Sequence, residues 1–185
     1  MYLCRAIMNE QSLFGPFENS PLLNNLADRI AMSQQQQKPF QIFLQNLQGS
    51  SAAFVLQTIF THEKTNQWNH IVVLNDAEEA AYFFNSIESV TEAMDLFYFP
   101  SSFKTPHNFN FLNPSHVMLR TEALTKISMG GNKKIIVTYP EALFEKVILP
   151  KTLQKNIIQI KTNDSIDLNA MMQQFIDYGF ERTDF

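Results

Sequence analysis

The chain has 185 residues, 45% of them hydrophobic, which is enough to bury the core of one α/β domain and part of a second. Its formal net charge of −4 argues against strong autonomous binding of duplex DNA, because Lys and Arg contacts to phosphates supply most of that affinity. The single cysteine, Cys4, excludes an internal disulfide and a cysteine-rich metal site. No run approaches the roughly 20 apolar residues of a membrane span, so we expect no membrane partner. The single cysteine fits a cytoplasmic protein.

The first predicted helix begins at Pro21, with Ser20 as its N-cap. Residues 1–19 before it are predicted to form an irregular arm, with a turn at Gly15-Pro16. Leu23, Leu26 and Ile30 belong to its apolar stripe, and the helix is predicted to end in the polar run before Pro39.

Strand and helix patterns alternate from residue 40 to residue 150. The predicted strands are Phe40–Gln45, Asn69–Leu74, Asp95–Phe99 and Lys134–Thr138. The predicted helices are Ser51–His62, Asp76–Val90 with Asn75 or Asp76 as cap, Pro114–Met129 and Pro140–Val147. We expect Asn69–Leu74 to be buried on both faces and Ser101–Asn113 to be a loop. This alternation predicts an α/β fold with a mostly parallel sheet flanked by helices.

The pattern changes after Pro150. Asn156–Lys161 is predicted to be a strand, and Ser165–Tyr178 a helix that has Asp164 or Ser165 as its cap and ends at Gly179. A lone β-α pair cannot bury its apolar faces, so we interpret residues 153–185 as the truncated start of a second subdomain. The α/β domain itself is predicted to span residues 20–152.

A glycine turn lies between the first predicted strand and the helix that follows it. A phosphate-binding loop at such a place carries a second glycine, then Lys and Ser or Thr. Here Gly49 is followed by Ser50, Ser51 and Ala52, without that glycine or a lysine. We favour a tight strand-to-helix turn over weak anion binding, and we expect no measurable ATP affinity.

Other patterns in the chain favour a structural role over ligand binding or catalysis. The segment Phe99–Phe111 mixes aromatic residues with Lys104, but we favour packing on the domain surface over stacking with single-stranded nucleic acid. The four histidines, at positions 62, 70, 107 and 116, lack metal-ligand spacing, and no catalytic set is identifiable. The helical spacing of Met171, Met172 and Phe175 is typical of a core stripe.

Taken in order, these segments resemble the N-terminal module of bacterial transcription-repair coupling factors (Mfd), which is related to the helicase-like domain 1a of UvrB. The matching segments are LQGSSAAFVLQTIF, HIVVLNDAEEAAYFFNSI, YFP, MLRTEALTKI, IIVTYPEALFEKVILP and LNAMMQQFIDYGFERTDF. The resemblance covers nearly the whole chain. It implies a degenerate P-loop: UvrB keeps the lysine of this loop and binds ATP, whereas coupling factors have lost it.

The resemblance also implies a function. Coupling factors displace stalled RNA polymerase at DNA lesions and recruit UvrA for nucleotide excision repair, and their ATP and Mg belong to a C-terminal translocase that these residues lack. RNA polymerase and DNA would be bound by other absent domains. The N-terminal module would be a non-catalytic docking and regulatory part, held against a C-terminal domain when idle. By similarity to a UvrB motif, the UvrA contact would fall on Phe180, Glu181, Arg182 and Phe185. We expect Phe180 to be buried under the last helix.

Three alternatives stay open. The chain could be an active P-loop NTPase or helicase domain, although the missing lysine argues against that. It could be a UvrB-like clamp that binds damaged DNA, although the acidic balance argues against it. It could also be a freestanding α/β interaction module unrelated to repair.

Overall fold

The structure is a computed structural model that describes residues 15–91, 95–105, 108–131, 133–155, 158, 160–178 and 180. Its internal contacts divide the chain into two units, Met1–Ile148 and Leu149–Phe185, which we describe separately. The first unit holds the sheet, and the second holds the helices α7 (Pro150–Lys155) and α8 (Leu168–Asp177). The domain boundary predicted after residue 152 falls inside α7.

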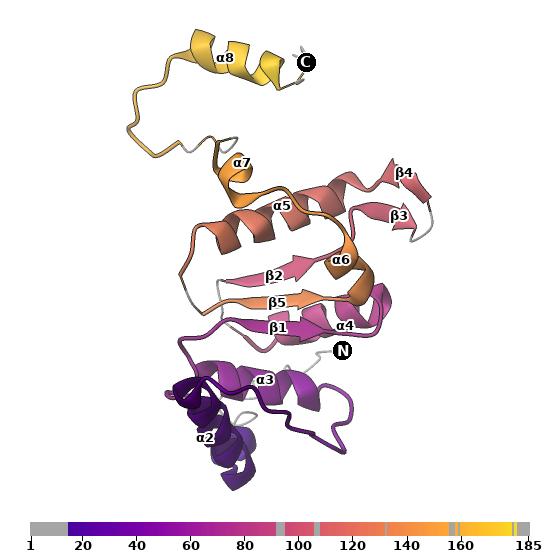
Figure 1. The fold of residues 1–185 in the computed structure, drawn as a ribbon, viewed down its shortest axis with the longest axis vertical. Coiled ribbons are helices and arrows are strands. Elements are labelled where there is room, and N and C mark those ends of the chain that lie inside the picture. Colours follow the sequence, from indigo (N-terminus) through magenta and orange to yellow (C-terminus); the bar gives the residue numbers. More distant parts are fainter. Residues whose placement is uncertain are drawn as a thin grey trace, which may run out of the picture. The chain divides into compact units, whose positions relative to one another are not determined.

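A parallel sheet forms the centre of the first unit (Figure 1). Its strands are β1 (His70–Val73), β5 (Ile135–Thr138) and β2 (Leu96–Phe99), in that spatial order. All four residues of β5 are buried, as expected of an apolar strand between two neighbours. Three of the predicted strands and the α/β class with a parallel sheet are therefore confirmed.

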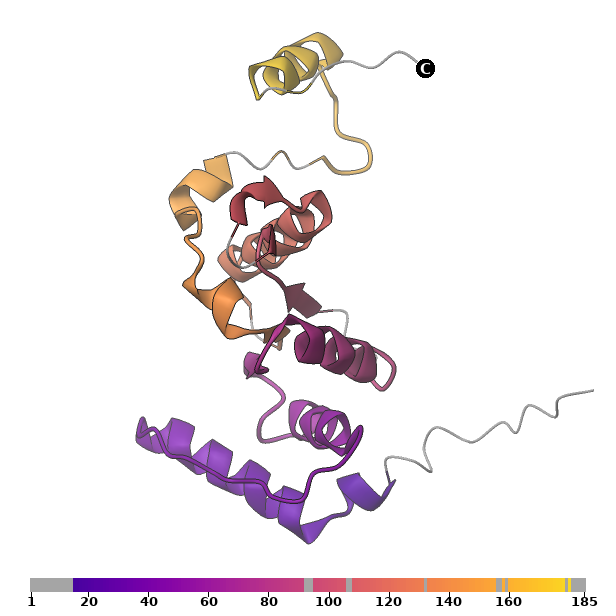
Figure 2. The same ribbon diagram turned by 90° about the vertical axis from the view of Figure 1, so that its right-hand side faces the viewer.

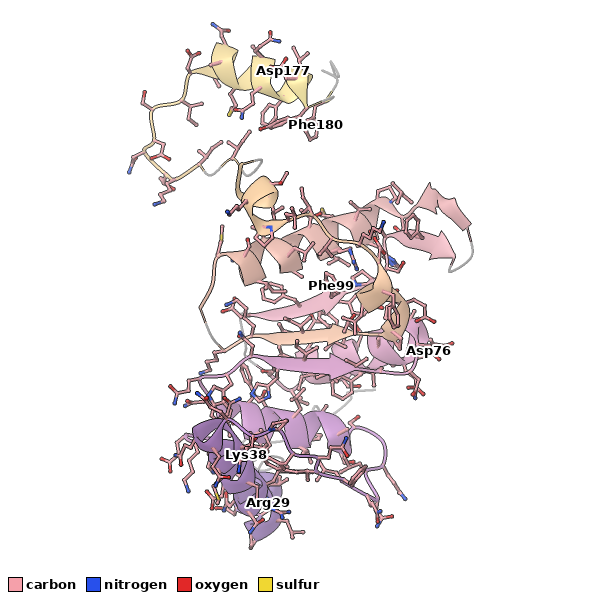
Figure 3. The ribbon with its side chains drawn as sticks, viewed as in Figure 1. Arg29, Lys38, Asp76, Phe99, Asp177 and Phe180 are labelled. Carbon is pink, nitrogen blue, oxygen red and sulfur yellow. The ribbon has the colours of Figure 1, made fainter. Side chains whose placement is uncertain are left out.

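Helices cover both faces of this sheet. On one face, α4 (Ala77–Glu88) contacts β2, since the Tyr98 hydroxyl donates to the Ala77 carbonyl at 3.2 Å. Helix α3 (Ser51–Thr61) packs beside α4 and places Ala53 and Phe60 in the same core. On the opposite face, α5 (Pro114–Ser128) packs on β2, where Phe99 points toward it (Figure 3). Tyr98 and Phe99 point to opposite faces because successive residues of a strand alternate.

The first predicted helix is α2 (Pro21–Gln36), which packs on α3 through Leu23, Leu26 and Ala27. Ser20 occupies the N-cap position, but its side chain makes no capping hydrogen bond. Residues 15–18 of the predicted irregular arm are helical, so the arm prediction is wrong for them, and residues 1–14 lie outside the described part.

The strand predicted at Phe40–Gln45 is not formed in this structure. The segment is extended but pairs with no described strand, and it runs back beside α2 (Figure 2). Ile42 packs against the cluster that α2 and α3 form. The sequence supplied the strand preference of this segment, but a strand also needs a neighbour to pair with.

Burial of β1 on both faces is also wrong. Its residues alternate between half-buried and exposed, with Ile71 63% and Val73 50% exposed. The register places Ile71 beside Ile136, which in turn lies beside Phe97, so these residues share the face on which α5 packs. Helix α5 lies over β2, at the other side of the sheet, and leaves β1 uncovered on this face.

The loop predicted at Ser101–Asn113 contains a hairpin instead. Its strands are β3 (Phe103–Thr105) and β4 (Asn108–Leu112), paired antiparallel with an irregularity between Phe103 and Thr105. The alternation in NFNFL was the missed signal, because polar and apolar residues alternate along a half-buried strand.

The remaining helices differ from their predictions mainly at the ends. Helix α6 (Pro140–Phe144) stops before the predicted Val147, and α7 was not predicted. Helix α8 is capped by Asp167, whose carboxylate accepts from two backbone N–H groups, and not by Asp164 or Ser165. Residues 158, 160 and 161 of the predicted strand Asn156–Lys161 are not in a strand. No residue of α8 is fully buried, so the predicted core stripe on Met171, Met172 and Phe175 is not formed.

Candidate functional site

Gly49, Ser50, Ser51 and Ala52 form the turn and the first residues of α3, but the segment before the turn is not a strand. Gly49 has φ +55°, a left-handed conformation that glycine adopts without strain. The N–H of Ser51 donates to the Gln48 carbonyl at 3.1 Å, and that of Ala53 donates to the Ser50 carbonyl at 3.0 Å. An anion site at a helix N-terminus needs free N–H groups, and two of those here are already occupied.

The side chains of this turn add no cation. Ser50 makes no capping hydrogen bond, and the Ser51 hydroxyl is buried without a hydrogen-bond partner among the described residues. The next lysine along the sequence is Lys64, beyond the end of α3, and its ammonium pairs with Asp28 of α2 at 2.5 Å. The turn therefore lacks the positive side chain that reaches the outer phosphates in a working P-loop.

The predicted partner contact lies mostly outside the described residues. This holds for Glu181, Arg182 and Phe185. Phe180 is described, and its ring meets the edge of Phe175 at 5.7 Å between centroids. The expectation that Phe180 is buried is wrong, since 64% of it is exposed just after α8 (Figure 3). In this unit Phe180 packs on one aromatic ring and leaves most of its surface exposed to solvent.

Helix α8 itself presents apolar surface. Leu168, Met172 and Ile176 recur at helical spacing and are 64%, 43% and 58% exposed. On the same unit, a hollow of about 430 Å³ is lined in part by Ile158, Ile160 and Met171. Large exposed apolar groups of this kind mark surfaces that another protein can cover.

The most developed polar cluster lies where β2 and β5 end, the edge at which parallel α/β sheets commonly bind ligands. Arg120 of α5 is 4% exposed and reaches this edge. Its guanidinium donates to the carbonyls of Pro100 and Ala142 at 2.9 Å and to that of Glu145 at 3.1 Å. It also lies 4.1 Å from the centre of the Phe99 ring. These contacts use its donors to join α5, the end of β2 and α6.

Glu145 completes this cluster from the other side. Its carboxylate lies 3.5 Å from the Arg120 Nε and accepts hydrogen bonds from the Ser101 hydroxyl at 3.1 Å and the Ser102 N–H at 2.8 Å. The Tyr139 hydroxyl accepts from the Ser101 N–H at 2.8 Å. Because these groups satisfy one another, the cluster is arranged as a structural joint and leaves little capacity for a ligand.

The electrostatics of the cluster agree with this interpretation. Burial alone would raise the pKa of Glu145, but the hydrogen bonds from Ser102 and Ser101 and the charge of Arg120 hold it below its ordinary value. Burial lowers the pKa of Arg120 and raises that of Tyr139. Burial, with a smaller contribution from Tyr139, raises the pKa of Tyr98 to about 12. The shifts of Glu145, Tyr139 and Tyr98 move their pKa values further from neutral pH, where a general acid or base works best.

Sequence reasoning missed Arg120 and Glu145. The available signal was the position of Arg120 three residues before the buried Ala123 on α5. A charged residue on the buried side of a helix requires a partner, because an unpaired buried charge is costly.

The remaining candidates are resolved only in part. Phe103 is half-buried, but His107 and the side chains of Lys104, Phe109 and Phe111 lie outside what the structure describes. His70 is half-buried in β1 against the Phe60 ring, and burial lowers its pKa. Within the described ranges, no group of three or more His, Cys, Asp or Glu could hold a metal ion, and no helix is long and apolar enough to cross a membrane.

Two relatives share part of this chain. The transcription-repair-coupling factor of Rickettsia typhi (strain ATCC VR-144 / Wilmington) is 25% identical over 118 residues, which is 60% of this chain and 10% of that protein. The transcription-repair-coupling factor of Rickettsia bellii (strain RML369-C) is 20% identical over 125 residues, 68% of this chain and 11% of that protein.

The chain thus spans about a tenth of the length of these relatives. No family model and no solved structure matches it. The partial similarities support a relation to transcription-repair coupling factors, without defining which module of such a factor the chain corresponds to.

Proposed function

We propose that this chain is a non-catalytic docking and regulatory module of transcription-coupled repair, and that it recruits UvrA. The observation that carries the proposal is the similarity to two transcription-repair-coupling factors over 60% and 68% of the chain. In the parent protein, RNA polymerase, DNA, ATP and Mg would be bound by other domains. The module would be cytoplasmic, and a C-terminal domain would cover it when the protein is idle.

The glycine turn supports docking over catalysis. Gly49 is followed by small side chains without a lysine, and the N–H groups of Ser51 and Ala53 donate within the chain. Cradling a triphosphate requires free N–H groups and a positive side chain together. The described polar cluster at Arg120 offers no substitute, because its donors are occupied by backbone carbonyls.

The second unit supports a protein partner. Phe180 and the apolar side of α8 are exposed, and Arg182 follows two residues after Phe180. Arginine and aromatic residues are enriched in binding hot spots, because they combine packable surface with directed polar groups. We place the UvrA contact on Phe180, Glu181, Arg182 and Phe185.

A calorimetric titration of UvrA into the full chain tests this function. We expect saturable binding that Arg182→Ala weakens by about 2 kcal/mol, the scale of an interface hot spot. Arg29→Ala is the matched control, because Arg29 is an exposed arginine on α2 in the other unit, and it should leave the affinity unchanged (Figure 3). Equal binding by both variants would remove Arg182 as the anchor, and no binding by the unmodified chain would remove UvrA recruitment.

Two of the three alternatives predict ligands of their own. An active P-loop NTPase would bind MgATP, and a UvrB-like clamp would shift damaged DNA in a gel at low salt, where phosphate contacts are strongest. We expect neither result.

A further inference from the structure

The outer edge of β1 has unpaired backbone groups. Among the described strands β1 has one neighbour, β5. The N–H of His70 donates to the Lys134 carbonyl at 2.8 Å, and that of Leu74 donates to the Thr138 carbonyl at 2.9 Å. In a parallel ladder the intervening residues point the other way, so Ile71 and Val73 direct their N–H and C=O groups out of the sheet. Such an edge is a template for one more strand.

An apolar groove of about 560 Å³ lies beside this edge. Alternate residues of two extended segments line it: Phe40, Ile42 and Leu44 from the segment after α2, and His70, Val72 and Leu74 from β1 and the residue after it. Helix α3 lines the groove between them through residues that include Val55 and Ile59. Phe40 and Leu44 are still 44% and 48% exposed, so the groove leaves apolar surface in contact with water.

In both segments, side chains that line the groove alternate with side chains that point away from it. Phe43 does not line the groove and is 80% exposed, just as Ile71 and Val73 point away from it and are 63% and 50% exposed. If Phe40–Leu44 lay beside β1, its groove-lining residues would continue the row that faces α3. Phe43 would then lie next to Ile71 and Val73 on the opposite face, because side chains alternate between the faces of a sheet.

We propose that the segment Phe40–Leu44 is a strap that closes onto the free edge of β1 as a fourth, parallel strand of the sheet. Closing covers the apolar groove and gives the outward backbone groups of Ile71 and Val73 hydrogen-bond partners. The inference does not depend on the proposed function, because none of its observations involves the UvrA contact proposed in the second unit.

The connectivity favours this occupant over an outside one. The strap is joined to α2 at one end and to α3 at the other. Closure is therefore intramolecular and does not depend on the concentration of a second molecule. The order strap, α3, β1 is also a strand-helix-strand unit, the usual connection between adjacent parallel strands. Its residues FQIFLQ carry the strand pattern that the sequence predicts.

Amide hydrogen exchange of the full chain, followed by NMR at low protein concentration, tests the strap. We expect the Ile71 and Val73 amides to exchange about 100-fold more slowly than unstructured amides, as amides in sheet ladders do. Phe43→Asp should speed their exchange at least tenfold, because a charged carboxylate beside Ile71 and Val73 disfavours the closed strap. Leu22→Asp is the control, since Leu22 is 82% exposed on α2 and does not line the groove.

Ile42→Pro is a second variant, because proline removes a backbone donor and restricts the strand conformation. Protection that survives both Phe43→Asp and Ile42→Pro would overturn the proposal. Rapid exchange of Ile71 and Val73 in the unmodified chain would also overturn it. Protection that rises with protein concentration would assign the edge to a second copy, and protection gained only on adding another protein would assign it to that partner.

Discussion

The two edge strands of the central sheet, β2 and β1, differ in what packs against them. At β2, helix α5 covers the strand, and Arg120 and Glu145 bond to the chain around its carboxyl end. At β1, on the same face, Ile71 and Val73 are exposed, although β1 and β2 both lie at an edge of the described sheet. Both strands pair with β5 in the same register. The difference therefore comes from what packs around each strand and not from the ladder.

The stability and the adaptability of the first unit lie on different sides of the sheet. On the β2 side, a filled core and a satisfied polar cluster leave little capacity for new side-chain contacts, so this side holds the fold together. An exposed edge and a partly open groove can gain contacts at low cost, so the β1 side is where the unit can change.

The largest expected effect comes from removing the arginine of the joint. Arg120→Leu should lower the free energy of unfolding by about 3–5 kcal/mol, because it leaves the Glu145 carboxylate and three carbonyls without their buried partner. Urea denaturation measures the loss. Lys126→Leu on the same helix is the control, since Lys126 is exposed, and it should cost about 0.5 kcal/mol or less. Equal losses for both variants would contradict the structural role of Arg120.

The next effect compares two register partners on one face. Ile136 is 7% exposed in the central strand, and its neighbour Ile71 is 63% exposed at the edge. Ile136→Ala should lower the free energy of unfolding by about 2–4 kcal/mol, because it leaves a cavity in the core. Ile71→Ala should cost less than about 1 kcal/mol. A large loss for Ile71→Ala in urea denaturation would show that the β1 side is closed as tightly as the β2 side.

A smaller effect tests how α4 is fixed beside the sheet. The Asp76 carboxylate accepts from the Glu79 N–H at 2.9 Å and caps the helix. Asp76→Ala should therefore lower the free energy of unfolding by about 1 kcal/mol. Ser20→Ala is the matched control at the start of α2, where the side chain makes no capping bond, and it should have little effect. Thermal or urea unfolding of the two variants distinguishes them, and equal losses would contradict a specific cap at Asp76.

The last effect appears only in acid. The pKa of Glu145 is below its ordinary value of 4.5 in the folded chain, so below pH 4.5 the unfolded state binds more protons. The stability that Glu145 contributes is present above that pH and is lost as pH falls through its folded pKa. Urea unfolding of Glu145→Gln between pH 3 and 5 should show a shallower acid loss than the unmodified chain. An unchanged acid slope would mean that the cluster does not stabilise the charged carboxylate.

The sequence predicted the features that depend on local patterns. The apolar runs at β1, β2 and β5 identified these strands, and Asp76 was one of two predicted caps for α4. Signals of this kind lie within a few residues of one another, so they can be recognised without knowing what packs around them.

The features that depend on distant neighbours were missed. Phe40–Gln45 has a strand pattern but no strand neighbour in the described structure. Ile71 is a large apolar residue of the kind found in cores, yet it is exposed on the edge strand β1. Arg120 is explained only by carbonyls 20 to 25 residues away along the chain. At the candidate site, the missing lysine was visible in the sequence, whereas the hydrogen bonds that occupy the turn required the structure.

The most direct test of docking in place of catalysis is a pair of calorimetric titrations on one preparation, with MgATP and then with UvrA. Our account predicts no measurable heat of binding with MgATP, because the turn at Gly49 has no lysine and its N–H groups donate within the chain. It predicts saturable binding of UvrA. Micromolar MgATP binding without UvrA binding would contradict the account and identify a nucleotide-binding domain.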